Sequence, residues 1–488
     1  MCSVMKGIPL TKDFANGGVS FWYRQIGLPA RRPALPGPRD YDVAIVGGGY
    51  TGLWTAYYLK RAEPGLRIAI LEKEFAGFGA SGRNGGWLSA EFAGSRKRHA
   101  RARGRQAMID LQRAMFRSVN EVIEVARAEG IDADVHKGGL IHVATNPAQR
   151  RRLRAGVADL RAWGYGVDDV RLMERDEARE RLQVAGALEA SYSPHCARIQ
   201  PAKLAVGLAG VVEQLGVDIF EDTTVTEILP RGAAGPSGQN DHGGRGGKAA
   251  AVTTRGVVTA DYVIRATEGF TASLAGQHRQ WLPMNSSMIV TEPLPPDVWK
   301  HIGWHGSELL EDEAHAYVYA QRTADDRIAI GGRGVPYRYG SRTDHRGATQ
   351  AQTVALLWRM LVKLFPAAAD ARIAHAWCGV LGVPRDWCST VHLDHASGLG
   401  WAGGYVGSGV TTANLAGRTL RDLVLARDTA LTSLPWVGRQ VRQWEPEPLR
   451  WTGVQLIYTL FRAADRHENE RGTTTSAYAH LANLISGR

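Results

Sequence analysis

The residues with the clearest chemical signature form one glycine-rich turn, Gly-Gly-Gly-Tyr-Thr-Gly at residues 47–52. The turn follows a short apolar run, residues 42–46, and opens a segment with helical spacing. Gly47 permits the tight turn, Gly49 lets a pyrophosphate approach the backbone, and Gly52 lets the helix pack closely on the sheet. The helix N-terminus offers free N–H groups and a favourable dipole to phosphates. The pattern predicts a dinucleotide-binding site.

An acidic residue and a second glycine-rich loop indicate which dinucleotide is bound. Glu72 ends a second apolar strand, residues 68–71. A carboxylate at that place binds ribose hydroxyls and repels a 2′-phosphate. Residues 77–86, GFGASGRNGG, then give a long cofactor more backbone donors than NAD requires. The two loops together predict FAD.

The elements that must position these loops alternate along the chain. We predict an α/β fold, in which a Rossmann-like FAD-binding domain is combined with an interleaved antiparallel-sheet substrate domain. The predicted pieces are a lead-in at 1–40, FAD-binding segments at 41–90, 197–268 and 375–428, substrate segments at 91–196 and 269–374, and a helical tail at 429–488. The Gly-rich residues 231–250 are expected to be a loop between strands 225–229 and 251–254, and its role stays open.

Composition argues against several other classes of protein. The net charge is +11, but only 10 of the 59 basic residues are Lys, and the basic run at 95–105 has no interleaved aromatics. A solvated helix face explains that run better than a nucleic-acid surface. The four cysteines form no CxxC pair, and we expect no metal site. No signal peptide and no membrane-spanning run are apparent, so the expected location is the cytoplasm.

The string GASGRNGG, after VAIVGGGYTGL and LEKE, resembles the D-amino-acid oxidase superfamily of FAD-dependent amine oxidoreductases. The resemblance is strongest to the branch that holds γ-glutamylputrescine oxidase and aminophosphonate oxidoreductases. It covers most of residues 20–428 and extends to QPAKL at 200–204, RAT at 265–267 and GGYVGSG at 403–409.

Carried over by position, the resemblance implies three groups of cofactor contacts: the first turn around the pyrophosphate, the second loop beside the isoalloxazine, and residues 404–410 at the flavin pyrimidine edge. There, N–H groups and a helix N-terminus would stabilise the negative charge of the reduced ring. The complete expected set is Gly47, Gly49, Tyr50, Thr51, Gly52, Glu72, Lys73, Gly79, Ala80, Ser81, Arg83, Asn84, Gly85, Gly86, Val225, Ala266, Thr267, Cys378, Gly404, Val406, Gly407, Ser408, Gly409 and Val410.

Three departures from the family pattern affect what the resemblance implies. Ser408 stands where many relatives carry His, and the stretch 327–332 lacks the Lys that activates oxygen in monomeric sarcosine oxidase. Dioxygen or another electron acceptor is therefore expected. Cys378 lies eight residues before Asp386, a spacing that resembles the covalent flavin attachment of sarcosine oxidase. We expect its thiol to contact the flavin without bonding to it, although a covalent link and a purely structural Cys are alternatives.

The substrate end of the site carries fewer signals. Amine oxidation by a flavin requires positioning, an aromatic wall and a partner for any anionic tail, but no universal base. The candidate catalytic residues are Tyr317, Tyr319, Arg322, Arg333 and Trp377, with Trp87 as a further aromatic wall. Core packing is an alternative for the two tyrosines, and a surface ion pair with Asp325 or Asp326 is an alternative for Arg322.

The function expected from the resemblance is FAD-dependent oxidation of a small amine, amino acid or aminophosphonate. Hydride transfer to flavin N5 would give an imine that water hydrolyses. The alternatives are a dehydrogenase that passes electrons to a quinone or carrier protein, and a non-catalytic FAD-binding protein. A basic nucleic-acid binder is a third alternative, which a salt-dependent DNA shift would support.

Overall fold

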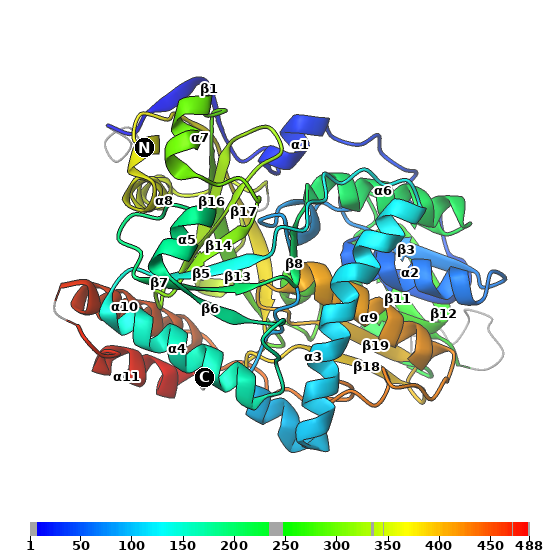
Figure 1. Cartoon of the computed structure of the whole chain (residues 1–488). Helices are drawn as coiled ribbons and strands as arrows, with labels where there is room; N and C mark the ends of the chain where they lie inside the picture. Colours follow the sequence, from blue (N-terminus) through cyan, green and yellow to red (C-terminus); the bar gives the residue numbers. More distant parts are fainter. Residues whose placement is uncertain (1–6, 234–246, 333–335, 345, 471, 487–488) are drawn as a thin grey trace.

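The computed structural model describes residues 7–233, 247–332, 336–344, 346–470 and 472–486. Two large sheets organise this part of the chain, and both draw strands from segments far apart in the sequence (Figure 1). None of the described helices has a stretch long and apolar enough to cross a membrane.

The eight-stranded sheet has the order β10-β11-β12-β2-β3-β9, with β19 also beside β12 and β18 beside β19. Its strands are β2 (Arg39–Val46), β3 (Ile68–Leu71), β9 (Asp218–Phe220), β10 (Val225–Leu229), β11 (Ala249–Thr253), β12 (Gly256–Arg265), β18 (Thr390–Asp394) and β19 (Leu399–Gly403). The predicted strands at 42–46, 68–71 and 225–229 are confirmed. Strands β12, β2 and β3 run parallel, and their last residues, Arg265, Val46 and Leu71, are aligned in register. The loops that leave these strands therefore emerge at one sheet edge.

Four helices pack around this sheet (Figure 1): α2 (Tyr50–Ala62), α3 (Arg96–Ala128), α6 (Pro201–Gln214) and α9 (Gly409–Val424). Leu53 and Trp54 of α2 are completely buried, in the core formed with α6 and α9. Helix α9 lies very close to α2, since a Cβ at Gly417 would lie 2.7 Å from the Trp54 carbonyl carbon. This close packing holds α2 and α9, which begin at residues 50 and 409, side by side.

The nine-stranded sheet is mixed, with the order β1-β17-β13-β16-β15-β14-β5-β7-β6. Its strands are β1 (Leu10–Asn16), β5 (Leu140–Ala144), β6 (Arg171–Glu174), β7 (Glu189–Ser193), β13 (Leu282–Thr291), β14 (Leu309–Asp312), β15 (Val318–Arg322), β16 (Ile328–Gly332) and β17 (Ile373–Val383). Only β1–β17 and β14–β5 pair in parallel. Two segments differ from the sequence-based grouping. The lead-in supplies β1, and residues 375–383 belong to this sheet through β17 rather than to the nucleotide-type sheet.

The remaining elements connect or cover the two sheets. Strands β4 (Trp87–Ser89) and β8 (Cys196–Arg198) form a two-stranded sheet. The other helices are α1 (Phe21–Ile26), α4 (Pro147–Ala162), α5 (Arg175–Arg181), α7 (Pro296–Ile302), α8 (Ala351–Leu364), α10 (Leu449–Glu470) and α11 (Ala477–Ser486), with 3-10 turns at Ala80–Gly82, Glu268–Ser273, Tyr339–Ser341 and Pro366–Ala368. The described part of the predicted tail beyond residue 448 consists mainly of α10 and α11. Most of the Gly-rich segment, residues 234–246, lies outside the described residues.

Candidate active site

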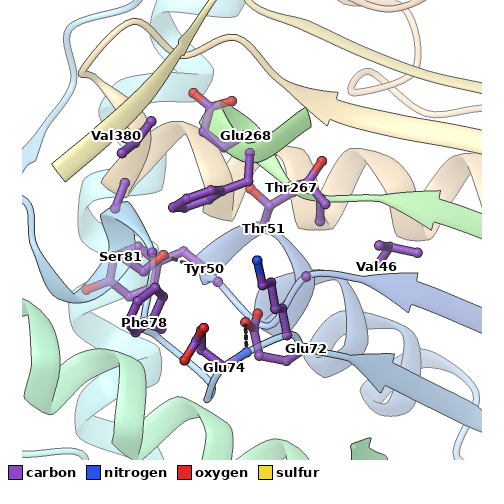
Figure 2. Close-up of a pocket in the computed structure, with 18 of the residues that line it drawn as sticks. Val46, Tyr50, Thr51, Glu72, Glu74, Phe78, Ser81, Thr267, Glu268 and Val380 are labelled. Carbon is purple, nitrogen blue, oxygen red and sulfur yellow. Dashed lines mark hydrogen bonds between the residues drawn. The ribbon is translucent and has the colours of Figure 1, made fainter. Parts of the chain in front are cut away.

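A cavity of about 400 Å³ opens where β2, β3 and β12 end. Figure 2 shows its lining, with Tyr50 and Ser81 on one side, Glu72 and Glu74 below, and Thr267 and Glu268 above. The predicted cofactor residues that line it are Gly47, Gly49, Tyr50, Thr51, Glu72, Lys73, Gly79, Ala80, Ser81, Asn84, Val225, Ala266, Thr267, Gly407, Gly409 and Val410. The structure thus brings together residues from all three predicted groups.

In the glycine-rich turn at residues 47–52, three positions have room only for glycine. Gly47 has φ +108°, and a Cβ there would lie 2.7 Å from the Ala266 carbonyl oxygen. A Cβ at Gly49 would lie 2.9 Å from the Ser81 hydroxyl, and one at Gly52 would lie 2.1 Å from the Gly47 carbonyl oxygen. Helix α2 begins at Tyr50, whose N–H donates to the Ser81 hydroxyl at 2.8 Å. The N–H groups of Thr51 and Gly52, which follow in the first helical turn, remain for a phosphate. Gly52 packs against the turn, as its predicted packing role requires, but it does not line the cavity in which it was also expected to contact the cofactor.

Glu72 supports the turn and also lines the cavity. Its carboxylate accepts hydrogen bonds from the Gly48 N–H at 2.7 Å and from the Glu74 N–H at 2.9 Å. Burial raises the pKa of Glu72 above its usual value, against the opposing effect of these hydrogen bonds. Each carboxylate oxygen retains acceptor capacity, so the side chain is placed to receive a ribose hydroxyl.

The second loop is shaped by its own side chains. The Asn84 amide donates to the Ser81 carbonyl at 2.8 Å, and its oxygen accepts from the Gly86 N–H at 2.8 Å. The Arg83 guanidinium lies over the Phe78 ring at 4.1 Å and donates to the Phe78 carbonyl at 2.7 Å. Burial lowers the pKa of Arg83 to about 10.

A third loop, residues 403–408, leads into α9 and is held by Glu268, which sequence reasoning missed. Glu268 accepts N–H groups from Gly404 at 2.8 Å, Tyr405 at 3.1 Å and Gly382 at 3.3 Å. Burial raises the pKa of Glu268 to about 7, although these hydrogen bonds favour its charged form. The expectation that Gly404 offers its N–H to the flavin is therefore wrong, because Glu268 already accepts it.

A second cavity of about 100 Å³ adjoins the first. The two share the lining residues Ala80, Asn84, Leu381, Gly407 and Val410. The second cavity also contains the predicted residues Arg83, Gly85, Val406, Ser408, Tyr317 and Tyr319, together with Trp87, Ser89, Glu91, Ser286, Glu311 and Gly379.

Aromatic side chains form one wall of the second cavity. The Trp87 and Tyr319 rings meet edge to face at 5.8 Å, and the Tyr319 hydroxyl lies 2.9 Å from the Ser286 hydroxyl. Among the residues that sequence reasoning missed, Glu311 had a detectable signal. It stands beside Asp312 in a strand that begins with two buried leucines, and adjacent acids in such a strand are unusual.

Four further predicted residues lie away from both cavities: Arg322, Trp377, Cys378 and Gly86. Arg322 pairs with Asp326 at 2.6 Å and lies over the Trp299 ring, which places it on the outer side of β15. The Trp377 indole is completely buried and donates to the Arg83 carbonyl at 2.9 Å, so the second loop separates it from the cavity.

Cys378 faces away from the cavity because it is adjacent in β17 to Gly379, which lines the cavity, and successive side chains alternate between faces. Its sulfur lies 3.5 Å from the Ala348 carbonyl oxygen. Gly86 lines neither cavity, and a Cβ there would lie 2.2 Å from the Gln321 amide nitrogen. Arg333 lies outside the described residues.

Comparison with known proteins agrees with this geometry. The family described as "FAD dependent oxidoreductase" matches residues 42–423. The chain belongs to this FAD-dependent oxidoreductase family. The cofactor is accordingly FAD, and the glycine turn, the Glu72 carboxylate and the helix N-terminus fit that dinucleotide.

Individual relatives of this oxidoreductase cover most of its length. It is 30% identical over 405 residues to "Gamma-glutamylputrescine oxidoreductase" of Escherichia coli, and the match covers 81% of this chain and 86% of the relative. It is 28% identical over 423 residues to "Probable oxidoreductase OrdL" of Rhizobium meliloti, and the match covers 85% of this chain and 90% of the relative. The crystal structure of glycine oxidase from Geobacillus kaustophilus has the same fold, with a TM-score of 0.67 and 23% identity over 82% of this chain and 99% of that one.

Proposed function

We propose that this FAD-dependent oxidoreductase oxidises a small amine at the carbon next to nitrogen. The observation that carries the proposal is the second cavity, which is small, walled by Trp87 and Tyr319, and contiguous with the cofactor cavity. Bound FAD supplies a hydride acceptor, and the oxidised substrate is an imine that water hydrolyses to a carbonyl compound. The two relatives named for γ-glutamylputrescine and glycine support an amine or amino acid as substrate.

The residues of the second cavity would act by positioning the substrate. The aromatic wall would pack against the carbon chain of an amine and restrict the directions from which it reaches the cofactor cavity. The Tyr319 hydroxyl is oriented by Ser286, which fixes the ring that forms this wall. After the third loop, the N-terminus of α9 adds a positive electrostatic end, where Gly409 lines the first cavity and Val410 lines both.

The second candidate function is that of a dehydrogenase whose electrons pass to a quinone or a carrier protein. The stretch 327–332, which contains no Lys, favours it over an oxidase by resemblance. To test both, purified protein is incubated with an amine panel and either dioxygen or an artificial quinone. We expect a carbonyl product that accumulates with at least one acceptor. If no amine is converted with any acceptor, although FAD is bound, the proposal of amine oxidation fails.

A further inference from the structure

We propose that the substrate carries two cationic groups, and that Glu311 binds the ammonium group remote from the reacting carbon. The inference rests on the proposed function and names a substrate class for it: diamines and related amines with a distal cation. The second cavity supplies the space, its aromatic wall suits the intervening carbon chain, and its acidic end supplies the charge.

The position of Glu311 defines which end of the substrate it would meet. Five residues are shared between the two cavities, and neither Glu311 nor Glu91 is among them. Glu311 and Tyr317 instead also line a third cavity, of about 250 Å³, on the other side. Glu311 therefore lies at the end of the second cavity away from the cofactor. A group bound there is separated from the carbon that reacts.

The carboxylate of Glu311 lacks a partner. Across the described residues, it receives no hydrogen bond and forms no ion pair. Burial and the nearby charge of Glu91 raise the pKa of Glu311 well above its usual value. An acid that faces a cavity without a counter-charge is stabilised by a cation that enters the cavity.

The paired residue on the neighbouring strand β5, His142, does not neutralise Glu311. Glu311 is aligned with His142 across β14 and β5, but the His142 ring contacts other acids, Glu91 at 3.2 Å and Glu313 at 3.6 Å. Burial opposes the charged form of His142, yet Glu91 raises its pKa to about 10. The two acids that contact this imidazolium, Glu91 and Glu313, already exceed its single positive charge, so His142 has none left for Glu311.

The remaining lining also favours a cation. Arg83 is the one Lys or Arg among the described residues that line the second cavity, and its guanidinium is directed to the Phe78 carbonyl. Trp87, Tyr317 and Tyr319 present rings that attract alkylammonium groups. An amine with a carboxylate at its far end would meet Glu311 and Glu91 with like charge, so this class of substrate is disfavoured.

The test compares three probes of equal chain length on the FAD-loaded, full-length protein: 1,5-diaminopentane, pentylamine and 5-aminopentanoate. Calorimetry measures binding, and anaerobic bleaching of the flavin measures reduction. We expect the diamine to bind at least about tenfold more tightly than the other two. If pentylamine or the amino acid binds as tightly as the diamine, the distal cation site is excluded.

The variant that tests the residue is Glu311→Gln, which keeps the shape of the side chain and removes its charge. Its matched control is Glu124→Gln, an exposed acid on α3 that lines none of the three cavities. We expect Glu311→Gln to weaken diamine binding about tenfold or more, with little change for pentylamine. Equal diamine affinity in Glu311→Gln and wild type would overturn the proposal. If Glu311→Gln does not fold, Glu91→Gln is measured in the same way.

Amine oxidation and the distal cation site are contradicted by different results. If diamines bind tightly but no amine reduces the flavin, the proposed amine oxidation is wrong and the cation site stands. If monoamines are oxidised and diamines show no preference, the proposed function stands and the cation site is wrong.

Discussion

The Ser81 hydroxyl accepts a hydrogen bond from the Tyr50 main-chain N–H at 2.8 Å, and so fastens the second glycine-rich loop to the first turn of α2 (Figure 2). The two loops that line the cofactor cavity are 31 residues apart in sequence at this contact. This side chain acts together with the Gly77 N–H, which donates to the Gly48 carbonyl at 2.9 Å, to set the relative position of the loops.

Removing that hydroxyl should weaken FAD binding. We expect Ser81→Ala to lose about 1 kcal/mol, or about fivefold in the Kd for FAD, because one buried N–H loses its acceptor. Titration of the apoprotein with FAD measures the change. Ser397→Ala, which alters a turn between β18 and β19, serves as the control and should bind FAD normally. An unchanged Kd in Ser81→Ala would show that the loops are held by other contacts.

A side chain at Gly49 should prevent FAD binding. Its Cβ would lie 2.9 Å from the Ser81 hydroxyl, and the methyl groups of Gly49→Val would occupy the place where a pyrophosphate approaches the backbone. The matched control is Gly65→Val in the next turn, where a Cβ would meet nothing within 4 Å. The FAD content of both purified variants is measured after extraction. A folded Gly49→Val protein with stoichiometric FAD would place the cofactor elsewhere.

The flavin should be bound without a link to Cys378. The sulfur faces Ala348 and Asp344 on the opposite side of β17 from the cavity, and burial raises the pKa of the thiol to about 12. We expect acid precipitation to release FAD into the supernatant, and Cys378→Ser to retain full FAD content. Flavin that remains in the pellet of wild type, but not of Cys378→Ser, would contradict this orientation.

Asp312 should make stability depend on pH. It is 5% exposed, and burial raises its pKa from 3.8 to about 7, so the folded state holds a proton that the unfolded state releases. Stability from this group is present below pH 3.8 and is lost as pH rises through 7. As pH rises from 3.8 to 7, the free energy of unfolding of Asp312→Asn should increase relative to that of wild type by on the order of 4 kcal/mol. Urea unfolding of both proteins near pH 3.8 and near pH 7 measures this difference. If the stability of variant and wild type changes equally with pH, the prediction is contradicted.

Local patterns predicted the cofactor half of the site because its key contacts are close in sequence. The turn at Gly47, the carboxylate at Glu72 and the loop around Ser81 fall within one βαβ unit, where glycine positions and strand ends are readable. Glu268 was missed because its partners, Gly382 and Gly404, reach it only through the pairing of distant strands.

Strand alternation explains the errors on the substrate side. Spacing in the sequence matched Cys378 to a flavin contact, but a shift of one residue in a strand changes the face, and Gly379 lines the cavity instead. Glu311 and His142 meet through parallel pairing of β14 with β5, between segments that no sequence motif connects. The acidic end of the second cavity was therefore not predictable from local pattern.

The most direct test of the central claim is the visible spectrum of the FAD-loaded protein during anaerobic titration with amines. We predict that an amine bleaches the oxidised flavin band with one equivalent per bound FAD, and that deuterium at the carbon next to nitrogen slows the bleaching. If dithionite bleaches the flavin but no amine of the panel does, this protein does not oxidise amines.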